Sequence, residues 1–137
     1  MQISGTYRTA ATWFLISLVI DQVSKYFALH SQLSIFYNPG ISFGFGEQLS
    51  VLLMSALVLA IAALLFVALK QFWFSHPALA GLFFGAVISN IIDRGVHVAV
   101  VDWIPIPFTS VHNNLADIFI VGVLGYRLLT DLQKERS

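Results

Sequence analysis

The sequence predicts an all-α membrane protein with four transmembrane helices and a small extracytoplasmic loop region that contains β-structure. Of the 137 residues, 58% are hydrophobic and only 10% are charged. The mean hydropathy of +0.83 is far above that of an ordinary soluble domain. Four apolar segments reach about 20 residues, the length that crosses a hydrocarbon core of roughly 30 Å. We therefore expect one integral membrane domain over residues 1–137, with no room for a separate soluble catalytic domain.

The first segment resembles a secretory signal, because Arg8 precedes its apolar run. However, Asp21 and Lys25 interrupt that run and no small-residue cleavage site follows it, so we expect a retained helix. The third segment contains Pro77 near its start and follows the second after a short connection. The four helices are expected at residues 10–29, 49–69, 72–92 and 115–132.

Lys and Arg residues predict the orientation, because short loops that carry them tend to stay in the cytoplasm. Five of them flank the expected helices on one side: Arg8, Lys70, Arg127, Lys134 and Arg136. The connections at residues 30–48 and 94–114 contain only Arg94, so we expect both termini inside and these two connections outside. Residues 35–45 (IFYNPGISFGF) place β-favouring residues around a turn, which predicts a small strand pair on the membrane surface.

The formal net charge is zero, which gives no sign of a nucleic-acid partner. The acidic residues are nevertheless clustered. Asp93, Asp102 and Asp117 fall at or between the outer ends of the third and fourth helices. Asp21 and Lys25, four residues apart on one face of the first helix, reach the same level. Ionisable groups placed this way in a membrane protein usually serve function.

Structural roles are the alternative for most of these residues. Asn114 and Asp117 have the spacing of a capping box at the start of the fourth helix. Arg94 suits the dipole at the end of the third helix, with Asp93 as an ion partner. Asp102 is different, because its neighbours VAVV and WIPIPF are poor surroundings for a solvated carboxylate.

Two histidines lie in the same outer connection as Asp102. His97 and His112 could join it in a metal site, but their spacing matches no helix-borne ligand motif. We therefore expect no metal and no other cofactor.

Paired carboxylates remain as the chemistry that the sequence favours. Two acids that share a site hold one proton between them, so one activates water while the other protonates a carbonyl oxygen or a leaving amine. Spacing alone leaves open whether Asp93 or Asp102 is the partner of Asp117. Two other classes also stay open: a small proton-coupled transporter or channel subunit that relays protons through Asp21, Lys25 and Asp93, and a non-catalytic membrane scaffold.

Five motifs together resemble the lipoprotein signal peptidase family (signal peptidase II), which are bacterial aspartic membrane proteases. They occur in the family's order: IDQVSKYF (20–27), NPGISFG (38–44), SNIIDR (89–94), VVDWI (100–104) and NNLADI (113–118). The resemblance implies that Asp102 and Asp117 form the catalytic dyad and that Asp93 supports them. The remaining site residues that it implies are Asn90, Arg94 and Asn114, which order the site and hold the substrate backbone, the outer turn at Asn38 and Gly40, and the first-helix pair Asp21 and Lys25.

The resemblance also implies the substrate and the location. The substrate is a diacylglyceryl-modified prolipoprotein, cut before its lipidated Cys, and the cyclic peptide globomycin is the expected inhibitor. The enzyme is expected as a monomer in the bacterial cytoplasmic (inner) membrane, in contact with membrane lipid, with its active site near the outer face. The motifs depart from the usual family sequence at Ser89, where Gly is usual, and at Asn113, where Phe is usual.

Overall fold

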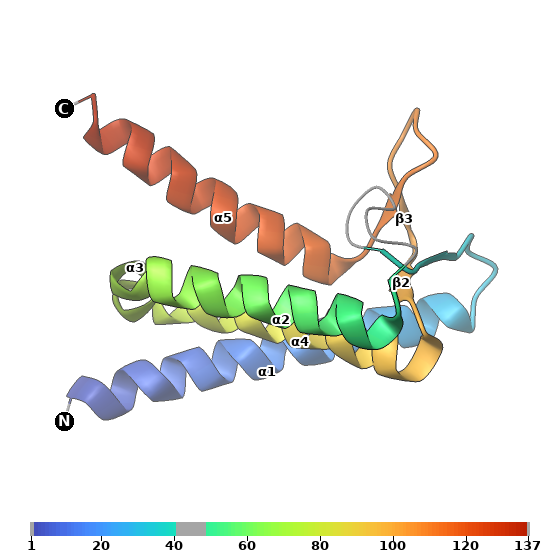
Figure 1. The fold of residues 1–137 in the computed structure, drawn as a ribbon, viewed down its shortest axis with the longest axis horizontal. Coiled ribbons are helices and arrows are strands. Elements are labelled where there is room, and N and C mark those ends of the chain that lie inside the picture. Colours follow the sequence, from blue (N-terminus) through green and yellow to red (C-terminus); the bar gives the residue numbers. More distant parts are fainter. Residues whose placement is uncertain (1, 41–48, 137) are drawn as a thin grey trace.

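The computed structural model describes residues 2–40 and 49–136 and is mostly helical. Its long helices extend along one direction, the short strands gather at one end, and both chain ends lie at the other (Figure 1). The elements in chain order are α1 (Gln2–Leu29), β1 (Phe36–Asn38), α2 (Val51–Ala68), α3 (Lys70–Ser75), α4 (Pro77–His97), β2 (Val100–Asp102), β3 (Ile104–Pro105), β4 (His112–Asn113) and α5 (Leu115–Lys134).

The expected third helix at residues 72–92 is wrong in its bounds, because a break at His76 divides that region. Pro77 has no backbone N–H and a fixed φ, so it is tolerated at the first position of a helix and not within one. It occupies the start of α4, and the short helix α3 precedes it. At its other end α4 continues to His97 and stops at Val98, whose φ of 63° is left-handed. The helix therefore carries Asp93 and Arg94 inside its last turns.

The closest helix pair is α1 against α4, and two glycines explain their proximity. Gly81 and Gly85 lie four residues apart on α4, a spacing of small residues that lets two backbones approach closely. A Cβ at Gly81 would lie 2.7 Å from the backbone nitrogen of Phe14, and one at Gly85 would overlap the hydroxyl of Ser17. This tight seam fixes the spacing of the polar residues that follow along both helices.

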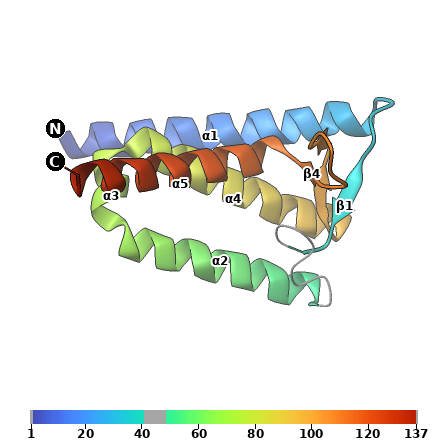
Figure 2. The ribbon, with the colours of Figure 1, turned by 90° about the horizontal axis from the view of Figure 1, so that it is seen from above.

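The apolar core lies between α2, α3, α4 and α5, and α2 runs along one side of the molecule (Figure 2). The buried members of this core are Ala62, Phe72, Trp73, Ala80, Phe83, Val87 and Val123. Many large apolar side chains point outward instead; Leu52, Val67 and Val121 are at least 70% exposed. Among the described helices, α2 and α4 are long and apolar enough to cross a membrane. Apolar surface on this scale indicates that lipid, and not water, surrounds the helices.

Two small antiparallel strand pairs close the end of the bundle. β1 pairs with β2 in the register that sets Phe36 opposite Asp102, and β3 pairs with β4 so that Ile104 faces Asn113. The expected strand within residues 35–45 is present, but its partner is β2; residues 41–45 of that stretch lie outside the described residues. Asp102 ends strand β2 and is not a loop residue. The pairing of β3 with β4 brings the chain to the start of α5.

Candidate active site

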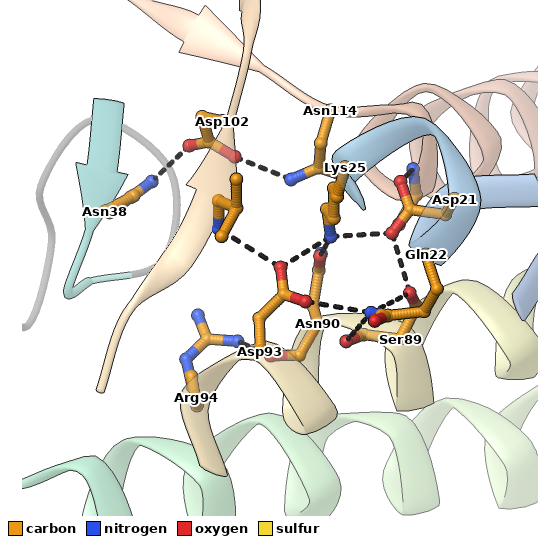
Figure 3. Close-up of polar contacts among 12 residues, drawn as sticks. Asp21, Gln22, Lys25, Asn38, Ser89, Asn90, Asp93, Arg94, Asp102 and Asn114 are labelled. Atoms are coloured by element: carbon orange, nitrogen blue, oxygen red, sulfur yellow. Dashed lines mark hydrogen bonds and ion pairs between the residues drawn. The ribbon is translucent and has the colours of Figure 1, made fainter. Parts of the chain in front are cut away.

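The ammonium group of Lys25 is the centre of a buried polar network between α1 and α4 (Figure 3). Its Nζ lies 2.6 Å from Asp21 Oδ2 and 2.7 Å from Asp93 Oδ2, and it donates to Asn90 Oδ1 at 2.9 Å. These three acceptors match the three N–H donors of an ammonium group. The expected pair of Asp21 and Lys25 is confirmed, and Lys25 is only 2% exposed.

The two acids of this network are tied to the rest of the site. Asp21 Oδ1 accepts from the backbone N–H of Ala116 at 2.8 Å, which fastens α1 to the first turn of α5. Asp93 Oδ2 accepts from the backbone N–H of Val101 at 3.1 Å, which fastens α4 to β2. Both carboxylates therefore position backbone segments that carry other site residues.

Sequence reasoning missed two members of the network. Gln22 Nε2 donates to Asp93 Oδ1 at 2.8 Å and to Ser89 Oγ at 2.9 Å. The Ser89 hydroxyl donates in turn to Asp21 Oδ2 at 2.6 Å. The available signal was spacing, because Ser89 lies four residues before Asp93 and Gln22 adjoins Asp21. Ser89 thus contacts Asp21 directly and is connected to Asp93 through Gln22.

Asn90 connects the Lys25 network to a second pair of carboxylates. Its Oδ1 accepts from Lys25, and its Nδ2 donates to Asp117 Oδ1 at 3.0 Å. Because an ammonium can only donate, the Asn90 amide has one favourable orientation, with its NH₂ toward Asp117. The network thus aims a donor at the Asp117 carboxylate.

Asn114 joins Asp102 and Asp117. Its Nδ2 donates to Asp102 Oδ1 at 2.6 Å and to Asp117 Oδ2 at 3.2 Å, and its Oδ1 accepts from the Asp117 backbone N–H at 2.9 Å as the N-cap of α5. Because both bonds start at the same nitrogen, Asp102 Oδ1 and Asp117 Oδ2 cannot be further apart than the sum of the two distances. One water molecule could therefore contact both oxygens. The N-cap is confirmed, and the same side chain holds two acids together.

Asp102 lies in an environment that disfavours its charge. It is 1% exposed, and burial raises the pKa of its carboxyl from the ordinary 3.8 to about 6. The hydrogen bond from Asn114 opposes this rise in pKa, the charge of Asp117 adds to it, and the hydrogen bond from Asn38 opposes it again. The result is a carboxyl that exchanges its proton near neutral pH.

The outer turn and Arg94 border the same place. Asn38 Nδ2 donates to Asp102 Oδ2 at 3.1 Å, and the Gly40 N–H donates to Asn38 Oδ1 at 3.0 Å. Arg94 Nη2 donates to the Gly40 carbonyl at 2.6 Å. A cavity of about 120 Å³ opens beside Asp117, and its polar walls are Asn38, Asn90, Arg94 and Asp117. The structure therefore brings all ten expected site residues together at one end of the bundle.

The ion pair expected between Asp93 and Arg94 is wrong. Successive residues of a helix point in different directions, so Asp93 faces Lys25 on α1 while Arg94 turns toward Gly40 and the Asn90 carbonyl.

The two histidines considered as metal ligands also separate. His112 stacks on Phe36 and His97 contacts Tyr37, and successive side chains of a strand point to opposite faces. In the part of the chain that the structure describes, no three His, Asp or Glu side chains are grouped as metal ligands.

Apolar outward-facing helices with a buried acidic cluster at one end define an α-helical membrane protein with a polar site inside it. Two solved structures described as bacterial membrane enzymes, obtained by the in meso method at 2.3 and 1.9 Å, share the fold with TM-scores of 0.72 and 0.68. The match to the first structure covers 93% of this chain and 89% of the matched chain, at 18% identity. The match to the second covers 90% of this chain and 92% of the matched chain, at 19% identity.

The chain belongs to the signal peptidase II family, since the family model described as Signal peptidase (SPase) II matches residues 13–131. The lipoprotein signal peptidase of Helicobacter acinonychis (strain Sheeba) is 31% identical, over 90% of this chain and 88% of its own. That of Symbiobacterium thermophilum is 29% identical, over 90% and 93%. The expected family is confirmed. The chain is thus a protease that removes signal peptides from lipoproteins. This argues against the transporter and scaffold alternatives.

Proposed function

We propose that this protein is an aspartic endopeptidase that removes the signal peptide from diacylglyceryl-modified prolipoproteins by cutting before the lipidated Cys. Asp102 and Asp117 form the catalytic dyad. The observation that carries this assignment is the Asn114 side-chain amide, which donates to both carboxylates at once. Asp93 has no such link to Asp117, because its oxygens accept from Lys25, Gln22 and Val101. This geometry favours Asp102 as the partner that spacing left open.

The distribution of charge supports one shared proton. Four carboxylates, Asp21, Asp93, Asp102 and Asp117, share the site with two cations, Lys25 and Arg94. The other five Lys and Arg residues of the chain lie in the first turns of α1, in α3 or beyond the middle of α5, so the site as a whole holds more acids than bases. Retaining one proton on the pair relieves their repulsion.

The pair then hydrolyses the peptide bond in two steps. The ionised acid takes a proton from a water molecule as that water attacks the scissile carbonyl, and the protonated acid donates to the carbonyl oxygen. In the second step the base returns its proton to the leaving amine as the C–N bond breaks, and the other acid regains its proton from the diol hydroxyl. Both acids end with the one proton they began with, so neither a metal nor a covalent intermediate takes part.

The surroundings of the dyad fit an extended peptide substrate. Arg94 lines the cavity beside Asp117, and its Nε is buried with no hydrogen-bond partner among residues 2–40 and 49–136. A substrate carbonyl would satisfy this donor. Asn38 and Gly40 fix the outer turn next to Arg94, as the substrate-binding role requires.

We further propose four spans, α1, α2, α4 and α5, in the bacterial inner membrane. The strand end with the dyad lies near the outer face, and both termini are cytoplasmic, in keeping with the positions of Arg8, Lys70, Arg127 and Lys134. The protein acts as a monomer in contact with membrane lipid, and globomycin inhibits it.

The test is cleavage of a diacylglyceryl-modified prolipoprotein by purified protein in detergent. Asp102→Asn and Asp117→Asn should each reduce kcat by about 10³-fold or more, because the amide keeps the shape of the side chain but cannot exchange a proton. Asp131→Asn, far from the site, is the matched control and should cleave normally. Full activity in either dyad variant would disprove the assignment, as would cleavage that needs a divalent ion and stops with chelator.

A further inference from the structure

A polar cavity is lined by residues of α3 and of the C-terminal half of α5. These elements meet at the end of the bundle opposite the strands (Figure 2). The volume of the cavity is about 280 Å³, and its walls include Phe72, His76, Arg127 and Lys134. A second cavity of about 350 Å³ shares Phe72 and Arg127 with the first and adds Lys70. The two cavities therefore adjoin along the Arg127 side chain.

Arg127 is held in place before any ligand arrives. Its guanidinium carbon lies 5.4 Å from the centre of the Phe72 ring, a cation–π contact, and its Nη1 forms an ion pair with Asp131. Its Nε is buried and has no hydrogen-bond partner within the described ranges. A buried donor without an acceptor is unfavourable, and an anionic oxygen would satisfy it.

The charges around the cavities suit an anion. Three cationic side chains, Lys70, Arg127 and Lys134, line them, and Asp131 forms an ion pair with Arg127. The His76 ring stacks on Phe72 with centroids 4.7 Å apart, which orients a further nitrogen-bearing group on the same wall.

We propose that these adjoining cavities bind the phosphate headgroup of an anionic phospholipid from the cytoplasmic leaflet. The inference rests on the membrane orientation given above as part of the proposed function. Basic pockets between helices on the cytoplasmic side recognise such headgroups. The size of the first cavity lies just below the roughly 300–1,000 Å³ of pockets for drug-sized ligands, as fits a headgroup and not a whole lipid.

The neighbouring surface would accommodate the acyl chains. Val67 on α2 lines the second cavity together with Arg127 and is 73% exposed. Exposed apolar surface of α2 thus adjoins the cavity and would take the acyl chains.

The test is native mass spectrometry of the purified full chain in mixed micelles, with phosphatidylglycerol and phosphatidylcholine offered at equal concentration. Wild type should retain phosphatidylglycerol preferentially. Arg127→Gln and Lys134→Gln should each weaken that binding about fivefold, the effect expected for one basic residue, with phosphatidylcholine unchanged. Arg136→Gln is the matched control, since it removes one charge at the same end but lines neither cavity, and its binding should stay within about twofold of wild type.

Three results would overturn the proposal: equal retention of both lipids by wild type, equal losses in Arg136→Gln and Arg127→Gln, or displacement of phosphatidylglycerol by millimolar inorganic phosphate, which would assign the site to a soluble anion. If Arg127→Gln does not fold, Lys134→Gln in the exposed last turn carries the test. Lipid retention is measured without peptide substrate, so its failure is separate from failure of the peptidase assay.

Discussion

Replacing Asp93 with asparagine should damage the fold far more than the chemistry. The carboxylate is 2% exposed, and its oxygens accept from Lys25, Gln22 and the Val101 backbone. The amide that Asp93→Asn introduces would keep one acceptor oxygen, and its NH₂ group would face donors. Lys25 would also keep only Asp21 as a charged partner.

The expected cost follows from these contacts. Removing one partner of a buried ion pair costs about 3–5 kcal/mol, because the other charge stays buried. Asp93→Asn also leaves one hydrogen-bond donor without its acceptor. This donor belongs to the same network, so the free-energy cost of its lost bond is already included in the range given for the ion pair. Asp131→Asn is the matched control. Its side chain is 42% exposed in an ion pair with Arg127, and such pairs contribute at most about 1 kcal/mol.

The assay is the free energy of unfolding, from SDS titration of the purified protein in mixed micelles, with prolipoprotein cleavage measured on the folded fraction. We expect Asp93→Asn to lose several kcal/mol while its folded fraction keeps kcat within about tenfold of wild type. A fully stable Asp93→Asn protein without activity would refute the reasoning and move Asp93 into the dyad. Equal losses of stability in the Asp93 and Asp131 variants would show that the buried network has no special energetic role.

Three further results are expected. The raised pKa of Asp102 means that the folded state disfavours its ionised form, so its own contribution to stability should fall by about 3 kcal/mol as pH rises from about 4 through 6; the stability of wild type relative to Asp102→Asn, measured by unfolding titrations, should fall over that range. Asn114→Ser keeps a helix cap but loses the amide between the acids, so stability should fall by about 1–3 kcal/mol because a buried acceptor loses its donor, while kcat falls at least tenfold; unchanged kcat would contradict the bridging role. Gly85→Ala should destabilise by about 3 kcal/mol because its Cβ would overlap the Phe14 carbonyl oxygen, a backbone atom that cannot rotate away, whereas Gly95→Ala, with open space around it, should be neutral or stabilising by about 1 kcal/mol in the same titration.

Much of this architecture could be predicted because hydropathy and turn residues are local signals. The helices at residues 49–69 and 115–132 end within two residues of α2 and α5, and the Asn114 cap was visible from its spacing to Asp117. Pro77 divides the expected third helix into α3 and α4. Hydropathy cannot mark such a break, because the apolar residues continue across it.

The sequence could predict which residues form the site, but not which of them contact one another. The motifs indicated which acids and amides belong together, but Lys25 contacts Asp93 across 68 positions of sequence, and only the packing of α1 on α4 sets that contact. The role of Ser89 depends on Gln22 reaching it from another helix. Pairing of Asp102 with Asp117 likewise depends on the register of β3 with β4, which a short stretch of sequence does not specify.

The double role of Asn114 limits how this enzyme can be engineered. One side chain both caps α5 and holds the dyad, so helix formation and assembly of the reacting groups share the same first turn. A substitution that strengthens or frays that turn would change heat resistance and turnover together. Gly122 and Gly125 lie further along α5, where an added Cβ meets no atom within 4 Å. Alanine at these two positions would stabilise the helix by about 1 kcal/mol each and leave the catalytic turn unchanged.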